Sequence, residues 1–334
     1  MTGGGVLLSV RNLGVRFPTP HGELQALDDV SFELRRSRTL AIVGESGSGK
    51  SVLSRAILRL LPAKALVAPA ARVTFDGVEL LSRSRRQMQA VRGRRIAMVF
   101  QDPMTALNPV RTIGSQLVEG PQRHLGLSRG QAAARALELL RQVGIGSPER
   151  RLGQYPHELS GGMRQRVVIA MAIACEPELL IADEPTTALD VTVQAEILEL
   201  LRRLQAQRHM TMILITHDLG VAAGFADEIA VMYAGQLVER ADTRSVFKHP
   251  RMPYAQALLR SIPRLDDAPH AALHTIPGRP PTVYGNAAAG CRFAARCEYR
   301  IDRCALETPV LQTAPPGRQF RCWAPLDAAP EEAV

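Results

Sequence analysis

The sequence contains no apolar run of about 18 residues, the length that a membrane-spanning helix requires. Its opening residues, Met1 to Gly5, also lack the basic and apolar regions of a secretory signal peptide. These two absences predict a protein that lies in the cytoplasm and has no membrane span.

Lysine is scarce. It occurs only at positions 50, 64 and 248, so the formal net charge of +9 comes almost wholly from arginine. A basic balance permits a nucleic-acid or acidic-membrane partner, but scattered arginines are also typical of an ordinary solvated surface. The charge alone therefore identifies no partner, and we expect no binding to nucleic acid.

Cysteine is nearly absent before the last 44 residues, which hold four of the five thiols. So few cysteines in a cytoplasmic chain argue against a disulfide framework. The isolated Cys175 lies in a predicted helix, and we expect it to be a small buried residue. The clustering of the other four needs a separate explanation.

One glycine-rich stretch stands out. Residues 44–51, Gly-Glu-Ser-Gly-Ser-Gly-Lys-Ser, fit G-x-x-x-x-G-K-[ST] at every fixed position. They follow the apolar run 39–43 and precede residues 52–61, whose apolar side chains recur at helical spacing. Such a loop wraps its N–H groups around a polyphosphate, while Lys50 reaches the β- and γ-phosphates and Ser51 reaches Mg²⁺. A plain glycine-rich turn is the alternative, and the strand–loop–helix context disfavours it.

The rest of the chain alternates short strands with helices. Strands are expected at 6–17, 29–34, 72–77, 95–100, 179–183 and 211–215, and helices at 131–140 and 191–208. Ser128 is placed to cap the first of these helices and Gly144 to end it. The pattern predicts an α/β fold with a mostly parallel sheet covered on both faces and a helical insertion between about 102 and 160.

Two acids, Asp183 and Glu184, end one apolar strand. Beside a phosphate loop, such a pair suits a Mg²⁺ carboxylate and a group that polarises the attacking water. A second anion site is predicted where Ser160 caps a helix whose first N–H groups are left open by Gly161 and Gly162. Taken alone, each feature is more often a solvated turn or an ordinary helix cap.

The order and spacing of these motifs resemble those of an ATP-binding-cassette (ABC) ATPase. The similarity covers about residues 6–245 and rests on the phosphate loop, Gln101, Ser160 to Gly162, the Asp-Glu pair, Thr187 to Asp190, and His217. It implies the ABC-type P-loop NTPase fold, with an antiparallel β-subdomain and a helical subdomain, and ATP hydrolysis that depends on Mg²⁺.

The resemblance also implies a role for each matching residue. Phe17 would stack on adenine, Glu184 would polarise water, and His217 would contact the γ-phosphate and position Glu184. Gln101 would sense Mg²⁺ and the γ-phosphate. The residues expected to bind the ATP phosphates are Gly44, Ser46, Gly47, Ser48, Gly49, Lys50, Ser51 and Val52, and the expected Mg²⁺ ligands are Ser51, Gln101 and Asp183. The signature residues expected to face the nucleotide of a partner cassette are Leu159, Ser160, Gly161, Gly162 and Met163, with Asp190 on the same interface.

The last quarter of the chain narrows the resemblance. Residues 249–263, the Pro277-Gly278 pair and residues 290–297 are similar to the extension that follows the cassette in importers for dipeptides, oligopeptides and nickel. Residues 246–334 hold 12 of the 23 prolines, which marks a change in composition. We expect a nucleotide-binding domain at 1–245 and a C-terminal extension at 246–334.

The four clustered cysteines are Cys291, Cys297, Cys304 and Cys322. Their gaps of five, six and seventeen residues match neither the ferredoxin run nor the zinc knuckles. Four thiols in a short tail with little core of its own suit a metal centre. In the importers that this tail resembles, it is associated with a [4Fe–4S] cluster. The resemblance therefore implies such a cluster, with zinc and unligated thiols as alternatives.

Together, these features predict the ATPase subunit of an ABC importer for di- and oligopeptides, at the cytoplasmic face of the cell membrane. The expected partners are a second, non-identical cassette subunit, two transmembrane permeases and an extracytoplasmic substrate-binding protein. A nickel importer of the same family is the nearest alternative. A soluble ABC protein that acts on nucleic acid or ribosomes, or an exporter ATPase, is less favoured, because the chain has one phosphate loop, no heptad segment and no fused membrane domain.

Overall fold

The computed structural model describes residues 5–187, 189–262, 274–285, 289–315 and 317–326. These residues form two compact units. Unit 1 contains residue 5, residues 35–38 and residues 82–215, and unit 2 contains residues 6–34, 39–81 and the described residues from 216 onward.

Unit 1 contains a parallel sheet whose strands are almost wholly buried. Strand β8 (Leu179–Asp183) pairs on one side with β7 (Ile96–Val99) and on the other with β9 (Thr211–Ile215). Every residue of β8 and β9 is buried, as expected for parallel strands that are covered on both faces. The predicted bounds of β8, of β9 and of helix α9 (Val191–Arg208) are confirmed.

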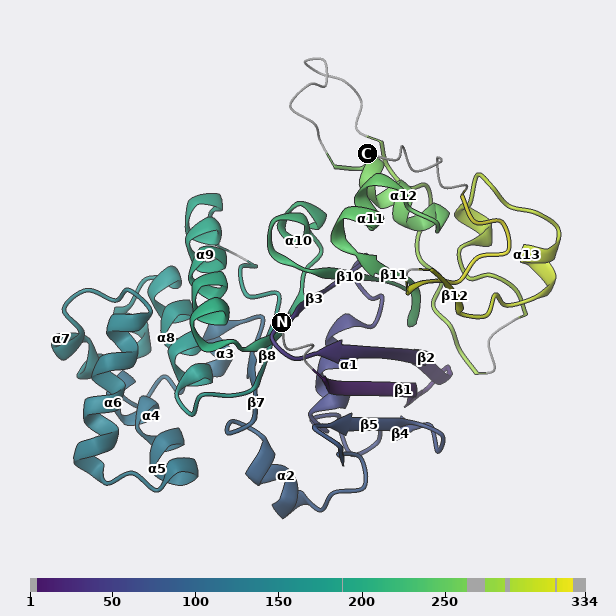
Figure 1. The fold of residues 1–334 in the computed structure, drawn as a ribbon. Helices are drawn as coiled ribbons and strands as arrows, with labels where there is room; N and C mark the ends of the chain where they lie inside the picture. Colours follow the sequence, from purple (N-terminus) through teal and green to yellow (C-terminus); the bar gives the residue numbers. More distant parts are fainter. Residues whose placement is uncertain (1–4, 188, 263–273, 286–288, 316, 327–334) are drawn as a thin grey trace. The chain divides into compact units, whose positions relative to one another are not determined.

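Helices fill the stretch between β7 and β8, drawn from blue to teal in Figure 1. They are α3 (Pro103–Ala106), α4 (Ile113–Leu117), α5 (Glu119–Leu125), α6 (Arg129–Gln142), α7 (Pro148–Leu152), the 3₁₀ turn η1 (Pro156–Glu158) and α8 (Gly161–Ile173), while α2 (Arg85–Val91) precedes β7. Ser128 caps α6 by accepting a hydrogen bond from the Gln131 N–H, and Gly144 follows the helix end with φ of +74°. The helical insertion, the cap and the stop are therefore confirmed.

Unit 2 combines an antiparallel sheet with the strands that surround the phosphate loop. The antiparallel sheet has the order β2-β1-β5-β6, with β4 also paired to β1. Its strands are β1 (Val6–Thr19), β2 (Gly22–Arg35), β4 (Leu66–Val67), β5 (Arg72–Phe75) and β6 (Val78–Glu79). Elsewhere in unit 2, β3 (Thr39–Val43) runs parallel to β10 (Glu228–Tyr233), and β11 (Gln236–Asp242) pairs antiparallel with β10.

Several of the expected boundaries are wrong: β5, β7 and α6 differ from their expected bounds by one or two residues at an end, and two differences are larger. Helix α1 (Lys50–Ile57) ends four residues before the predicted end, because Arg59 adopts a positive φ of +52° and Pro62 follows. The loop between β1 and β2 is shorter than predicted, since the strands run to Thr19 and from Gly22. The Thr19 hydroxyl closes this turn by donating to the Gly22 carbonyl at 2.7 Å.

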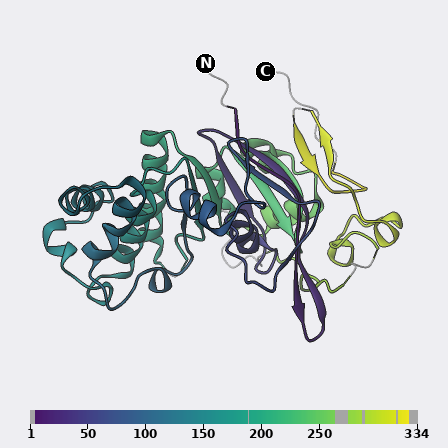
Figure 2. The same cartoon turned by 90° about the horizontal axis from the view of Figure 1, so that it is seen from below.

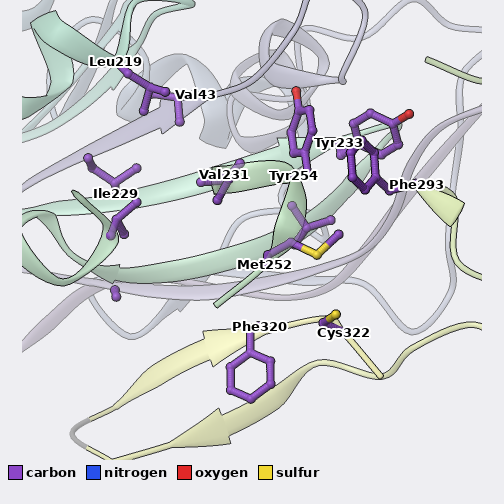
Figure 3. Close-up of a cluster of buried hydrophobic side chains, with 14 of the residues drawn as sticks. Val43, Leu219, Ile229, Val231, Tyr233, Met252, Tyr254, Phe293, Phe320 and Cys322 are labelled. Atoms are coloured by element: carbon purple, nitrogen blue, oxygen red, sulfur yellow. The ribbon is translucent and has the colours of Figure 1, made fainter. Parts of the chain in front are cut away.

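The described part of the C-terminal extension belongs to unit 2 and packs against the strands of that unit. Figure 2 shows its last hairpin in yellow, and the second strand of this hairpin, β13 (Arg318–Phe320), pairs with β11. The elements from residue 216 onward, besides β10 and β11, are α10 (Leu219–Phe225), α11 (Thr243–Lys248), α12 (Pro253–Arg260), η2 (Ala294–Arg296), α13 (Arg303–Leu306), β12 (Gln312–Ala314) and β13 (Arg318–Phe320). Phe293, Phe320 and Cys322 join Val231 and Tyr254 in one buried cluster (Figure 3). The extension therefore shares its core with the sheet of unit 2.

The buried carboxylate of Glu239 ties β11 to the extension. Its side chain is 0% exposed and accepts hydrogen bonds from the N–H groups of Arg251 at 2.9 Å and Met252 at 2.8 Å. The guanidinium of Arg318 on β13 pairs with the same carboxylate at 2.5 Å. Since a buried charge is tolerated only when it is paired and hydrogen-bonded, this group fixes how the extension docks.

Replacing Glu239 with alanine should loosen the extension. The change leaves the buried guanidinium of Arg318 without its counter-charge, which costs about 3–5 kcal/mol. Urea unfolding followed by the emission of Trp323, the single tryptophan and itself part of the extension, measures the loss. Glu33→Ala is the control, because Glu33 forms a solvent-exposed pair with Arg11 that contributes about 0–1 kcal/mol. Equal unfolding midpoints for the two variants would contradict this assignment.

Candidate nucleotide site

The phosphate loop joins the buried strand β3 to helix α1 in unit 2. All five residues of β3 are buried, and α1 begins at Lys50 directly after Gly49. Gly44 has φ of +150°, and a Cβ atom there would lie 2.2 Å from the carbonyl oxygen of Met232 on β10. Only glycine fits this position. The backbone of the loop therefore passes so close to the end of β10 that a side chain at position 44 has no room.

Lys50 lies along this loop. Its side chain is 5% exposed, and its ammonium group donates to the carbonyls of Gly44 at 2.8 Å and Glu45 at 3.0 Å. The turn after β10 supports the loop from outside, since the N–H of Gly235 donates to the Ser48 carbonyl at 3.0 Å. The ammonium group is thus held on two carbonyl oxygens of the loop at the start of a helix, and its positive charge and the helix N-terminus both suit a polyphosphate.

The other expected nucleotide residues of unit 2 lie near the ends of its strands. Ser46 and Gly47 are exposed in the loop, and Ser51 and Val52 lie in the first turn of α1. Phe17 is half-buried on β1, and His217 immediately precedes Asp218, which caps α10.

In unit 1, Glu184 is held by its neighbours at the end of β8. Its Oε2 accepts hydrogen bonds from the Gln101 amide at 3.0 Å and from the Thr187 hydroxyl at 2.8 Å, and its own N–H donates to Ile215 at 3.0 Å. Its φ of +48° is uncommon for a residue with a side chain. Asp183, which precedes it, is 2% exposed. The structure thus brings Gln101 and Glu184 together, and the bonds from Gln101 and Thr187 fix the orientation of the Glu184 carboxylate.

The signature residues begin helix α8 in unit 1. Ser160 caps the helix by accepting a hydrogen bond from the Met163 N–H at 3.3 Å. Ser160 and Gly161 are exposed. A Cβ atom on Gly162 would lie 2.8 Å from Cγ1 of Val193, so α8 and α9 approach too closely there for a larger residue. Because Gly161 and Gly162 carry no side chains, neither of them covers the first N–H groups of α8.

Two further residues of the expected partner interface are also in unit 1. Leu159 is buried just before α8, and Asp190 caps α9 by accepting a hydrogen bond from the Val193 N–H at 2.9 Å. The structure contains one chain, so the interface with a partner cassette stays a prediction.

Comparison with known proteins identifies the family. The model of the ABC transporter family matches residues 27–187, and that of the oligopeptide/dipeptide transporter C-terminal region matches residues 238–304. A probable peptide ABC transporter ATP-binding protein of Sinorhizobium fredii is 49% identical, with 95% of each chain covered. The chain belongs to the ABC transporter family.

Two further comparisons extend this result. The dipeptide transport ATP-binding protein DppD of Bacillus subtilis is 48% identical over 98% of this chain and 97% of its own length. A dimeric ATP-binding cassette, solved in a post-hydrolysis state with ADP and phosphate, is 27% identical with a TM-score of 0.64, covering 71% of this chain and 99% of that one. The predicted fold, an α/β cassette with antiparallel and helical parts, is therefore confirmed. The chain is an ATPase.

Magnesium is the metal ion that ABC ATPases use with ATP. The side chains expected to hold it, Ser51, Gln101 and Asp183, offer hydroxyl, amide and carboxylate oxygens, the donor class that Mg²⁺ prefers. The chemistry of the donor set fits the ion. Within the described part of this cassette, no helix is both long and apolar enough to cross a membrane.

The expected [4Fe–4S] cluster is not supported. The thiols of Cys291, Cys297, Cys304 and Cys322 are neighbours, and the N–H of Cys291 donates to the Cys304 carbonyl at 2.8 Å. Three of them pack against the core that contains Phe293, where burial raises the pKa of Cys291 and Cys297 and raises that of Cys322 to about 12. Among the described residues, which include all four, no group of three or more Cys, His, Asp or Glu side chains is arranged to hold a metal ion. Zinc fails the same test.

Sequence reasoning missed two residues of the extension that contact the phosphate loop and the loop residue that they contact. Glu45, between the two predicted phosphate-binding residues Gly44 and Ser46, received no role. Its N–H donates to the Tyr254 hydroxyl at 3.0 Å, and its carboxylate pairs with Arg296 at 2.7 Å. Both partners lie in stretches that resemble the importer extension, but a separation of 251 residues between Glu45 and Arg296 conceals the contact from any local pattern.

The fit of Gly44 gives a steric prediction. Gly44→Ala should destabilise the cassette by about 1–3 kcal/mol beyond the backbone strain, because its methyl group meets a backbone oxygen. Gly47→Ala is the matched control, since Gly47 also has a positive φ, of +79°, but nothing lies within 4 Å of an added Cβ. Thermal unfolding of both variants measures the difference. An equal loss of stability in both would show that the close approach to β10 is unimportant.

Proposed function

We propose that this chain is the ATP-hydrolysing subunit of an importer that takes up di- and oligopeptides. The observation that carries this proposal is the match of residues 238–304 to the oligopeptide/dipeptide transporter C-terminal region, because a cassette alone fits any ABC transporter. The names of the two relatives, which refer to peptide and dipeptide transport, support the same cargo. Nothing in these comparisons favours nickel.

The proposed assembly contains a second, non-identical cassette, two permeases and an extracytoplasmic binding protein, with this chain at the cytoplasmic face of the membrane. The nucleotide-binding domain would span residues 1–245, with its helical subdomain at about 102–160, and the extension would span 246–334. Gln101 and the helical subdomain would receive the permeases' contacts, since Gln101 touches Glu184 and precedes α3.

The proposed mechanism assigns the ATP phosphates to the loop and to the first turn of α1, with Phe17 on the adenine. Ser51, Gln101 and Asp183 would hold Mg²⁺, which when bound neutralises phosphate charge. Glu184 polarises the attacking water, because its carboxylate is oriented by Gln101 and Thr187 and accepts protons or hydrogen bonds. His217 contacts the γ-phosphate in this scheme.

The role of Glu184 predicts the effect of Glu184→Gln. Glutamine keeps an oxygen for the bonds from Gln101 and Thr187 but loses the charge that activates water. ATP binding should persist while turnover falls by about 10²–10⁴-fold. Steady-state hydrolysis and ATP titration measure the two effects. Glu199→Gln, at an exposed pair with Arg202 on α9, serves as the control. Near-normal turnover in Glu184→Gln would refute the assignment.

The signature helix is proposed to act on the nucleotide of a partner cassette, and the dimeric structural relative, which was solved with ADP and phosphate, supports the pairing of two cassettes. Ser160→Arg should then block closure of the dimer while the isolated chain still binds ATP. Mixing this variant with Lys50→Ala chains should restore at most one of two sites, if homodimers form. Loss of ATP binding by the isolated Ser160→Arg chain would show that the helix serves its own nucleotide.

The assembly is tested by co-purification from the native membrane. We expect the full chain to recover two permeases and a second cassette, with ATP strengthening the association. Recovery with ribosomes or DNA, and without a permease, would overturn the transporter function.

A further inference from the structure

The side chain of Arg296 reaches the phosphate loop from the extension. The guanidinium is 5% exposed and pairs with the Glu45 carboxylate at both ends: Nη1 lies 2.7 Å from Oε2 and Nη2 lies 2.9 Å from Oε1. This bidentate geometry is the strongest that an arginine and a carboxylate form. Glu45 is the second residue of the loop, so the extension contacts the nucleotide-binding machinery of unit 2 directly.

Arg296 is itself held on several sides. Its Nε donates to the Pro277 carbonyl at 2.7 Å, Nη2 donates to Ile276 at 3.3 Å, and Nη1 donates to the Tyr233 hydroxyl at 3.2 Å. The guanidinium also lies 5.7 Å from the centre of the Tyr233 ring. The Glu45 hydrogen bonds raise the pKa of Arg296 above its ordinary value, so its charge is permanent. The cation is therefore presented to Glu45 in one orientation.

A second contact holds the backbone of the same loop residue. Tyr254 is 0% exposed, and its hydroxyl accepts the hydrogen bond from the Glu45 N–H at 3.0 Å. Burial raises the pKa of Tyr254, so the hydroxyl stays neutral. Figure 3 shows Tyr254 beside Tyr233 and Phe293, and the Tyr233 and Tyr254 ring centres are 4.5 Å apart. The aromatic cluster thus fixes the direction of the Glu45 peptide.

The charge of Glu45 makes these contacts important for the nucleotide. A carboxylate in a loop that binds a polyphosphate repels the ligand unless a cation compensates it. Lys50 contacts the carbonyl of Glu45, whereas the carboxylate is paired with Arg296. Without Arg296, the loop would keep the negative charge and lose a support.

We propose that Arg296 and Tyr254 are positioning residues for ATP binding: Arg296 neutralises the Glu45 carboxylate, and the two residues together hold the phosphate loop in its binding conformation. The inference rests on ATP binding by the cassette and is independent of the cargo.

The test compares ATP affinity in full-length variants. Arg296→Met should weaken ATP affinity, measured by calorimetric titration with Mg²⁺ present, on the order of tenfold, because the uncompensated carboxylate acts on the bound phosphates. KM for ATP should rise in parallel, with kcat changed far less. Adding Glu45→Gln to this variant should restore most of the affinity, since it removes the repelling charge. A purely structural role of Arg296 would not produce this rescue.

Arg321→Met is the matched control. Arg321 is also 5% exposed and anchors the extension elsewhere, pairing with Asp29 at 2.7 Å and donating to the Leu237 carbonyl at 3.0 Å. We expect its ATP affinity to stay within about twofold of wild type. Equal weakening by Arg321→Met would mean that general loosening of the extension causes the effect, and would overturn the inference.

Further outcomes separate the parts of the inference. Arg296→Lys keeps the positive charge but cannot form the bidentate pair, so it should weaken ATP affinity less than Arg296→Met does, and a loss as large as that of Arg296→Met would overturn the charge argument. Tyr254→Phe removes the acceptor of the Glu45 N–H and should give a smaller loss of ATP affinity than Arg296→Met.

Unchanged ATP affinity in Arg296→Met, or no rescue by Glu45→Gln, would also overturn the inference. Failure of the wild-type chain to bind ATP would instead refute the ATPase assignment, and with it this inference.

Discussion

A carboxylate inside a polyphosphate-binding loop needs a cation of its own, and Arg296 supplies that cation from a position 251 residues further along the chain. The backbone of the loop is constrained as well, since Gly44 has no room for a side chain against β10. Once the loop has this path, Lys50 lies folded along its carbonyls. The extension is therefore part of the structure that presents the loop to ATP.

Buried arginines repeat this kind of contact along the extension. Arg292 pairs with Asp28 at 2.5 Å, Arg321 with Asp29 at 2.7 Å and Arg318 with Glu239 at 2.5 Å, and each of these guanidinium groups is at most 11% exposed. Arginine suits such positions because its planar donors satisfy a carboxylate and nearby carbonyls together. Part of the arginine-rich composition thus serves internal pairing, which scattered positions in a sequence do not reveal.

Local pattern was enough to predict much of the fold. The strands β8 and β9 are continuous apolar runs, and α9 begins at the capping residue Asp190, so their bounds follow from neighbouring residues alone. The end of α1 was not predictable in this way, because the apolar spacing continues past Arg59 while the backbone turns there. The phosphate loop was recognised from its motif, but the partner of Glu45 depends on tertiary packing. The cysteines show the opposite error, since their clustering in the sequence suggested a metal site that the arrangement of the four thiols does not support.

The central claim is that ATP hydrolysis by this cassette drives peptide uptake. It is tested most directly by reconstituting the complete native transporter in vesicles and measuring accumulation of labelled di- and oligopeptides with ATP and with a non-hydrolysable analogue. The account predicts accumulation against a gradient with ATP and none with the analogue. Vigorous hydrolysis by the complete transporter without peptide accumulation, and with uptake of nickel instead, would contradict it.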